Sequence, residues 1–190
     1  MDDIDKKVTQ KLKDTKKYEV NLILSDINNY FRIIKSVMNY LVTERGMGGV
    51  YVSTTRPSKA MISRLGAEKI NMDDVFFVDS VSYMAEGPPA SVDNVIFIES
   101  PTMLEMMMIK TDTLLRKAKS PDKFVFFDSI NSLAIYNSEN ILSEFIHVLV
   151  NSFAGKDIYS FILSVKGGTP KNIEPLLRMV CDNVVEIGGE

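Results

Sequence analysis

The sequence predicts a three-layer α/β domain built on a mainly parallel sheet. Two observations predict it: the segments rich in Val, Ile and Phe are short and apolar on both faces, and helical stretches of about ten residues or more separate them. Strands of this kind, joined by helices, form parallel sheets that are covered on either side. A third observation is size, because 190 residues, 45% of them apolar, suffice for one domain with a substantial core.

The first half of the chain shows this alternation directly. The helical pattern that follows the first apolar strand stops at the glycine-rich sequence 46–49, which is typical of a helix C-terminus. Pro57 stands where a first-turn proline is tolerated, so a helix is expected to follow it. The elements expected in this half are the strands 20–24, 49–53 and 75–79 and the helices 27–44 and 58–69.

The second half continues in the same way after a loop that contains Gly87-Pro88-Pro89. Two of its helices carry more apolar residues than one buried face needs. The sequence 103–109 is apolar almost all round, which indicates either deep burial or a second, partner-binding face. In the helix 138–153 one stripe suffices for the core and leaves Ile141, Val148 and part of Val150 for a further contact. The elements expected here are the strands 94–98, 123–128, 158–163 and 183–187 and the helices 102–119, 138–153 and 173–180.

Residues 1–18 form a charged segment that precedes the α/β domain proper, 19–190. Ile4, Val8 and Leu12 recur every fourth position, which predicts a short helix with one narrow apolar stripe. Such a helix is either a docking element or a frayed end.

Composition excludes several classes of function. The net charge is -3, without the basic balance that nucleic-acid binding prefers. A single cysteine cannot form an internal disulfide, and no Cys/His cluster has zinc-ligand spacing, so a reducing cytoplasm fits and neither a metal nor another cofactor is expected. The sequence has no uninterrupted run of about 18 apolar residues and no secretory signal, so we expect no membrane association.

Ligands of parallel α/β sheets bind at the carboxyl ends of the strands, so the residues just after each strand are the candidates. One of these strand ends carries a motif: 123–128 consists of apolar residues that end in Asp128, followed by Ser129 and, four residues later, Leu133. This resembles the Walker B strand of RecA-like ATPases, in the Asp-Ser-x-x-x-Leu form of KaiC-like archaeal proteins. The sequences 49–57 and 166–186 are similar to other parts of that family, and the resemblance covers about residues 19–188 in the family's order.

The resemblance fails where the family binds phosphate. Its first strand runs into G-x-x-x-x-G-K-[ST], whose backbone amides, lysine and hydroxyl hold the phosphates and Mg²⁺. The corresponding residues 25–32 contain neither glycine nor lysine, and Asp26 places a carboxylate where phosphate would lie. Two like charges about 4 Å apart repel by about 1 kcal/mol in water and about 4 at an effective dielectric near 20. This stretch reads as a degenerate phosphate loop that comprises Ser25, Asp26, Asn28 and Asn29.

A second departure concerns the acidic pair that KaiC-like proteins carry after the second strand, where one glutamate prepares the attacking water. The matching positions are Thr54 and Thr55, whose hydroxyls cannot act as general bases at neutral pH. We therefore expect a non-hydrolysing pseudo-ATPase that acts as a regulatory or scaffolding protein. An active ATPase with an unorthodox loop is the weaker interpretation, because the glycine-rich sequence 46–49 lies at the entrance of its strand.

Two interpretations remain open for the other strand-end residues. Asp128 and Ser129 either cap a turn or, if a nucleotide binds, coordinate Mg²⁺; Lys166 and Arg56, with Arg32, are either solvated or form an anion site. The alternative function is thus a sensor that binds a nucleotide or another anion in a non-standard mode through Thr54, Thr55 and these charged residues. A protein partner is expected, for a chain that is a monomer or a homodimer.

Overall fold

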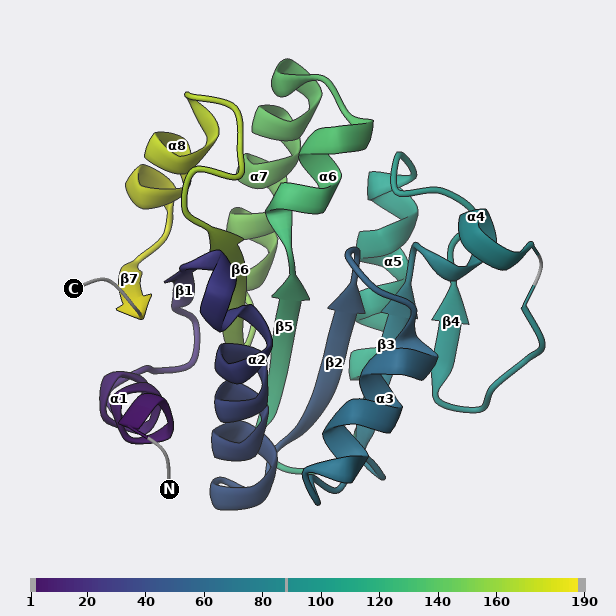
Figure 1. The fold of residues 1–190 in the computed structure, drawn as a ribbon, viewed down its shortest axis with the longest axis vertical. Coiled ribbons are helices and arrows are strands. Elements are labelled where there is room, and N and C mark those ends of the chain that lie inside the picture. Colours follow the sequence, from purple (N-terminus) through teal and green to yellow (C-terminus); the bar gives the residue numbers. More distant parts are fainter. Residues whose placement is uncertain (1–2, 88, 188–190) are drawn as a thin grey trace.

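The computed structural model describes residues 3–87 and 89–187, and these form one seven-stranded sheet in which all strand pairs are parallel. The strand order is β4-β3-β2-β5-β6-β1-β7, so β5 lies at the centre (Figure 1). The strands are β1 (Val20–Ser25), β2 (Gly48–Ser53), β3 (Val75–Asp79), β4 (Val95–Phe97), β5 (Lys123–Asp128), β6 (Tyr159–Val165) and β7 (Asn183–Ile187).

Helices connect the strands and cover both faces of the sheet. The α-helices are α1 (Asp3–Leu12), α2 (Tyr30–Met38), α3 (Ser58–Ala67), α4 (Ser82–Glu86), α5 (Leu104–Leu115), α6 (Ile130–Tyr136), α7 (Glu139–Ala154) and α8 (Ile173–Val180). Helix α2 is preceded by a 3₁₀ turn, η1 (Ile27–Asn29), and continued by a π-helical segment, η2 (Asn39–Glu44).

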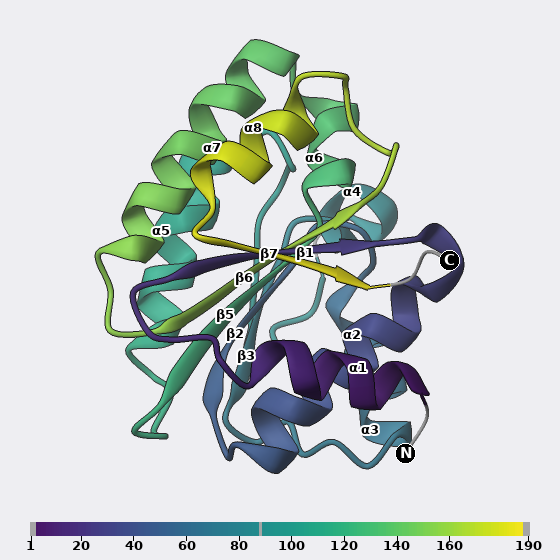
Figure 2. The same ribbon diagram turned by 90° about the vertical axis from the view of Figure 1, so that its left-hand side faces the viewer.

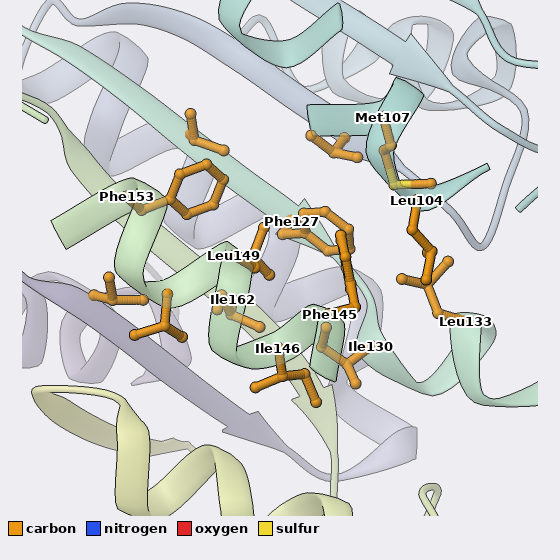
Figure 3. Packing of buried hydrophobic residues seen from close by; sticks show 14 of the residues in the cluster. Leu104, Met107, Phe127, Ile130, Leu133, Phe145, Ile146, Leu149, Phe153 and Ile162 are labelled. Carbon is orange, nitrogen blue, oxygen red and sulfur yellow. The ribbon is translucent and has the colours of Figure 1, made fainter. Parts of the chain in front are cut away.

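The sheet separates two hydrophobic clusters, which makes the three layers visible when it is seen along its edge (Figure 2). Helices α1, α2 and α3 pack on one face, and α5, α6, α7 and α8 pack on the other. Side chains alternate between the two faces along each strand. In β5, Phe124 and Phe126 face the α1–α3 layer and Phe127 faces the α5–α8 layer (Figure 3), and all three are completely buried. This alternation explains why the strands read as continuous apolar runs.

The predicted fold class is confirmed, and each predicted strand and helix is present with ends shifted by a few residues. Two short helices were missed. Helix α6 has seven residues directly after β5, in the stretch that the Asp-Ser-x-x-x-Leu motif occupies, and α4 has five residues inside the predicted loop. Both are too short for the apolar periodicity on which the sequence prediction rests.

The predicted N-terminal helix packs on the domain. Val8 and Leu12 of α1 are completely buried in the cluster that contains α2, and Ile4 is partly buried against it. The division into a segment 1–18 and a domain 19–190 stays a prediction. Among the residues that the structure describes, no helix has the length and apolar character needed to cross a membrane.

Candidate functional site

The candidate site lies at the carboxyl end of β5, the central strand. Asp128 alternates with Phe126, so its side chain points to the α1–α3 face of the sheet, where it is completely buried. The register pairs Asp128 with Ser53 of β2, which places Tyr51 two residues down the neighbouring strand on the same face. Helix α2 covers this face and begins at Tyr30. The topology therefore brings two tyrosines to one buried carboxylate.

Both carboxylate oxygens of Asp128 accept hydrogen bonds from these tyrosines. The Tyr30 hydroxyl donates to Oδ1 and the Tyr51 hydroxyl donates to Oδ2. Burial raises the pKa of Asp128 from 3.8 to about 6, although the two hydroxyl donors and the positive charge of Arg56 act in the opposite direction. Burial and the nearby Asp128 carboxylate also raise the pKa of both tyrosines, which stay neutral donors. Each carboxylate oxygen thus has a partner within the protein.

Ser129 and Thr54 join the ends of β5 and β2 through backbone contacts. The amide of Thr54 donates to the carbonyl of Asp128 at 2.7 Å, and the amide of Ser129 donates to the Thr54 hydroxyl oxygen at 2.8 Å. That hydroxyl also lies 2.8 Å from the carbonyl oxygens of Asp128 and Ser129. The peptide bond between Asp128 and Ser129 is cis. Thr54 is buried and bridges two strands, whereas Thr55 is exposed, with its hydroxyl 3.3 Å from that of Ser129.

The predicted degenerate phosphate loop is a short connection between β1 and α2. Asp26 alone separates the strand from the 3₁₀ turn, and neither Asp26 nor Asn29 uses its side chain to cap the helical segment that follows it. Among the described residues, positive φ angles occur only at Tyr18, Lys69 and three glycines, all outside 25–32. The connection therefore lacks the left-handed backbone positions from which a glycine-rich anion cradle is built.

The predicted basic residues each contact a different part of the protein. Lys166, after β6, forms an ion pair with Glu186 of β7, with Nζ 3.0 Å from the carboxylate. Arg56, after β2, is exposed and lies close enough to Asp128 to lower its pKa. The side chain of Arg32 is exposed on α2, 3.5 Å from the Asn29 side-chain oxygen. The three basic residues thus have different partners, and a joint anion site stays a prediction.

Asp79, at the end of β3, is a strand-end residue to which the sequence assigned no role. Its Oδ2 accepts from the amide of Ser58, at the start of α3, at 2.6 Å. Its Oδ1 accepts from the amides of Val81 and Ser82, both at 2.9 Å, and the Ser82 hydroxyl donates to Oδ2 at 2.7 Å. Burial acts to raise the pKa of Asp79, but the hydrogen bonds from Ser58 and Ser82 outweigh it and hold the pKa below its ordinary value. Asp79 fixes the N-termini of two helices.

The glycine-rich sequence 46–49 lies at the opposite edge of the sheet, at the amino end of β2, as expected. A Cβ atom at Gly49 would lie 2.2 Å from the carbonyl oxygen of Phe124, and one at Gly48 would lie 2.0 Å from an Asp74 carboxylate oxygen. Gly46 has φ +64°. Close packing and one left-handed turn account for these glycines. Among the described residues, no group of three or more His, Cys, Asp or Glu side chains is placed to hold a metal ion.

Solved structures share this fold. A KaiC-like protein from Pyrococcus horikoshii OT3 superimposes with a TM-score of 0.60 at 10% identity, over 88% of this chain and 70% of that one. The flagellar accessory protein FlaH from Methanocaldococcus jannaschii gives 0.59 at 15% identity, over 100% and 80% of the two chains. An uncharacterized Pyrococcus horikoshii protein, crystallised with an unknown peptide, gives 0.65 at 12% identity, over 95% and 82%.

These likenesses define the class of fold, which is the α/β fold of RecA-like, KaiC-like proteins. No family model and no curated protein matches the sequence. At these identities the neighbours identify the fold, and the role of this chain has to be argued from its own residues.

Proposed function

We propose that this chain is a RecA-like pseudo-ATPase, a domain that does not hydrolyse ATP and acts through protein contacts in a regulatory or scaffolding role. The observation that carries the proposal is the hydrogen bond from Tyr30 to Asp128. Tyr30 belongs to the segment that corresponds to the phosphate loop, and its side chain occupies the space in front of the aspartate of the Walker B-like strand. A hydrated Mg²⁺ ion would have to displace this tyrosine to reach the carboxylate.

Two further observations support the loss of hydrolysis. The short connection between β1 and α2 supplies no glycine, no lysine and no left-handed backbone position for binding phosphate. At the end of β2, Thr54 is buried and its hydroxyl is used between the strands, while Thr55 has only a hydroxyl to offer. Neither side chain can accept a proton from an attacking water at neutral pH. At these positions the chain therefore offers neither the groups that bind a triphosphate nor a base that activates water.

The structural neighbours favour an accessory role. FlaH is described as a flagellar accessory protein, and the uncharacterized Pyrococcus protein was crystallised with a peptide. We propose a comparable dependence on a protein partner for this chain, and a cytoplasmic location. The location fits the lone Cys181, whose thiol is buried and whose pKa is raised to about 12 by that burial and by Asp182, so that it is not reactive.

A nucleotide or anion sensor is the second candidate, and one observation favours it. Arg56 is exposed just after β2 and lies near enough to Asp128 to act on its pKa, so an anion could approach this guanidinium from solvent. The ion pair of Lys166 with Glu186 weighs against an anion site that combines this lysine with Arg56 and Arg32, because it directs the Lys166 ammonium towards β7.

Isothermal titration of ATP with Mg²⁺ into the purified chain, with ADP as the control, tests the proposal. The expected result is no saturable heat at millimolar ATP. A dissociation constant below about 100 µM, which is about -5.5 kcal/mol, would favour the sensor, and Arg56→Ala should then weaken it. ATP hydrolysis that Asp128→Asn abolishes, in a variant whose circular dichroism matches the parent, would overturn the proposal.

A further inference from the structure

Helices α5 and α7 form an apolar groove on the outer side of the α5–α8 layer. Its volume is about 790 Å³. Leu104 and Phe145 form its floor and are nearly buried, and the Phe145 ring packs against Phe127 of the central strand with 6.1 Å between ring centroids (Figure 3). The core beneath the groove is therefore already complete.

The rim of the groove is apolar and exposed. Ile109 of α5 is 56% exposed, and Ile141 and Val148 of α7 are 51% and 59% exposed. Met103, just before α5, is also exposed. Single exposed apolar residues are ordinary, but a contiguous set that lines a groove is typical of a protein-binding site. Methionine side chains suit such a site because they adapt to the shape of a bound helix.

The end of α6 is tied to the segment that leads into α5. The Asn137 side-chain amide donates to the carbonyl of Pro101 at 3.3 Å, which holds the α6–α7 junction beside the segment that leads into α5. Ile135 and Tyr136, directly before this junction, are 77% and 45% exposed.

The charges along the groove indicate what kind of segment it binds. Of the described residues that line it, the only charged ones are Glu105 and Glu144, one on each helix. An apolar groove with carboxylates on both sides matches an amphipathic helix whose apolar stripe is flanked by lysine or arginine.

Two other occupants fit less well. In a symmetric contact between copies of this chain, the same groove faces itself, so the two acidic rims would meet without basic partners. The chain's own lysine-rich helix α1 is already engaged, because Val8 and Leu12 of its apolar stripe are buried on the α2 side of the sheet.

We infer that the α5–α7 groove is the docking site for a basic amphipathic helix of a partner protein. This inference rests on the proposed function and deepens it, because it identifies the surface through which the protein contact is made and the chemistry of the partner segment.

Peptide titration tests the inference. The probe is a synthetic peptide of about 18 residues with leucine at helical spacing, lysine on both flanks of the stripe and one tryptophan in it. The chain contains no tryptophan, so the emission of the peptide reports binding alone. Two control peptides replace every lysine by glutamate or keep the composition and scramble the stripe. The protein variants are Ile109→Ser/Val148→Ser, Glu105→Lys/Glu144→Lys and, as a matched control outside the groove, Met179→Ser, since Met179 of α8 is 72% exposed.

The basic peptide should bind saturably with a blue-shifted emission, and the two controls should bind at least about tenfold more weakly. Ile109→Ser/Val148→Ser should also weaken binding by about tenfold or more, Met179→Ser should leave it unchanged, and Glu105→Lys/Glu144→Lys should reverse the preference towards the acidic peptide. Absence of saturable binding, or equal binding by all variants, would overturn the inference. A homodimer in analytical ultracentrifugation that Ile109→Ser/Val148→Ser dissociates would also overturn it, because a second copy would then be the occupant.

The result is independent of the nucleotide titration. A chain that binds the basic peptide and also hydrolyses ATP would retain the groove as a docking site and refute the pseudo-ATPase, whereas a chain that does neither would refute the groove alone.

Discussion

The strand ends and the α5–α7 groove lie in one domain and are built in opposite ways. At the strand ends the charged groups Asp128, Asp79 and Lys166 all have protein partners, and two of them are buried. In the groove, apolar side chains are exposed although the core beneath them is filled. The difference indicates that the polar region maintains the fold and the apolar region is free to bind. Substitutions should therefore change stability in the first region and binding in the second.

The largest effect should come from Asp79→Ala. The substitution removes the acceptor of the Ser58 and Ser82 amides, which are buried, and of the Val81 amide, which is partly buried; this should reduce the free energy of unfolding by about 3 kcal/mol. Urea unfolding followed by circular dichroism measures it. Asp79→Asn, which keeps one acceptor oxygen, should lose less. If the two variants were equally stable, the carboxylate would not be what holds the starts of α3 and α4.

Asp128 should make stability depend on pH in the opposite sense to Asp79. Its pKa in the folded chain is about 6, above the value of 3.8 that it has when unfolded, so the folded form binds the proton more tightly. Stability should fall as pH rises from about 4 to 6, by about 3 kcal/mol in total, and the loss persists above that range. The lowered pKa of Asp79 acts only at lower pH, where stability falls as pH decreases.

The measurement is the unfolding free energy of the parent and of Asp128→Asn at several pH values between 4 and 7. Because the substitution removes one titrating group, the difference between the two proteins isolates Asp128 from every other carboxylate. That difference should change by about 3 kcal/mol in favour of the variant as pH rises. A difference that stays constant across the range would show that Asp128 is not held in a raised-pKa state.

Tyr51→Phe and Tyr30→Phe separate the two donors to Asp128. At pH 7 the loss of the buried Tyr51 hydroxyl should cost about 2 kcal/mol, and the loss of the half-buried Tyr30 hydroxyl about 1, since water can replace a donor only at Tyr30. Each hydroxyl lowers the pKa of Asp128, so each variant should move the pH dependence of stability to higher pH. Equal stability of both variants and the parent would contradict the hydrogen bonds of the two tyrosines to Asp128, on which the role proposed for Tyr30 rests.

The sequence predicts those features of the fold and the site that depend on residues close together in the chain, and it misses those that depend on distant residues. The strands were predicted because they are continuous apolar runs, a signal that each segment carries by itself. The tyrosines were not predicted as partners of Asp128, because they lie 98 and 77 residues from it in the chain. Only the register of β2 against β5 and the packing of α2 bring them together. For Tyr51, the one available signal was its position two residues before the end of the second strand, which would place it on the same face as a residue at the strand end.

The same reasoning explains the other outcomes at the site. Lys166 and Arg56 both follow strands, and sequence alone allowed them to converge. In the sheet, β6 has β1 and β7 on one side, and it has β5 and β2 on the other. Lys166, which follows β6, forms its ion pair with Glu186 of β7, whereas Arg56 follows β2. In the groove, by contrast, the surplus of apolar positions on the helix 138–153 was enough to mark Ile141 and Val148, because helical spacing is a local property. Val150, which was also expected to contribute to that surface, is buried in the core.

The smallest expected change in stability is the sharpest test of the comparison. Val148→Ser removes an exposed apolar side chain from the groove rim and should alter the free energy of unfolding by no more than about 0.5 kcal/mol. Thermal unfolding measures it, with Met179→Ser as the control at an even more exposed position on α8. A loss above about 1.5 kcal/mol would mean that Val148 supports the core, and the groove would then belong to the fold like the strand ends. If Val148→Ser leaves the free energy of unfolding unchanged and weakens peptide binding, Val148 contributes to binding a partner and not to the stability of the domain. Stability and binding would then depend on different regions of the chain.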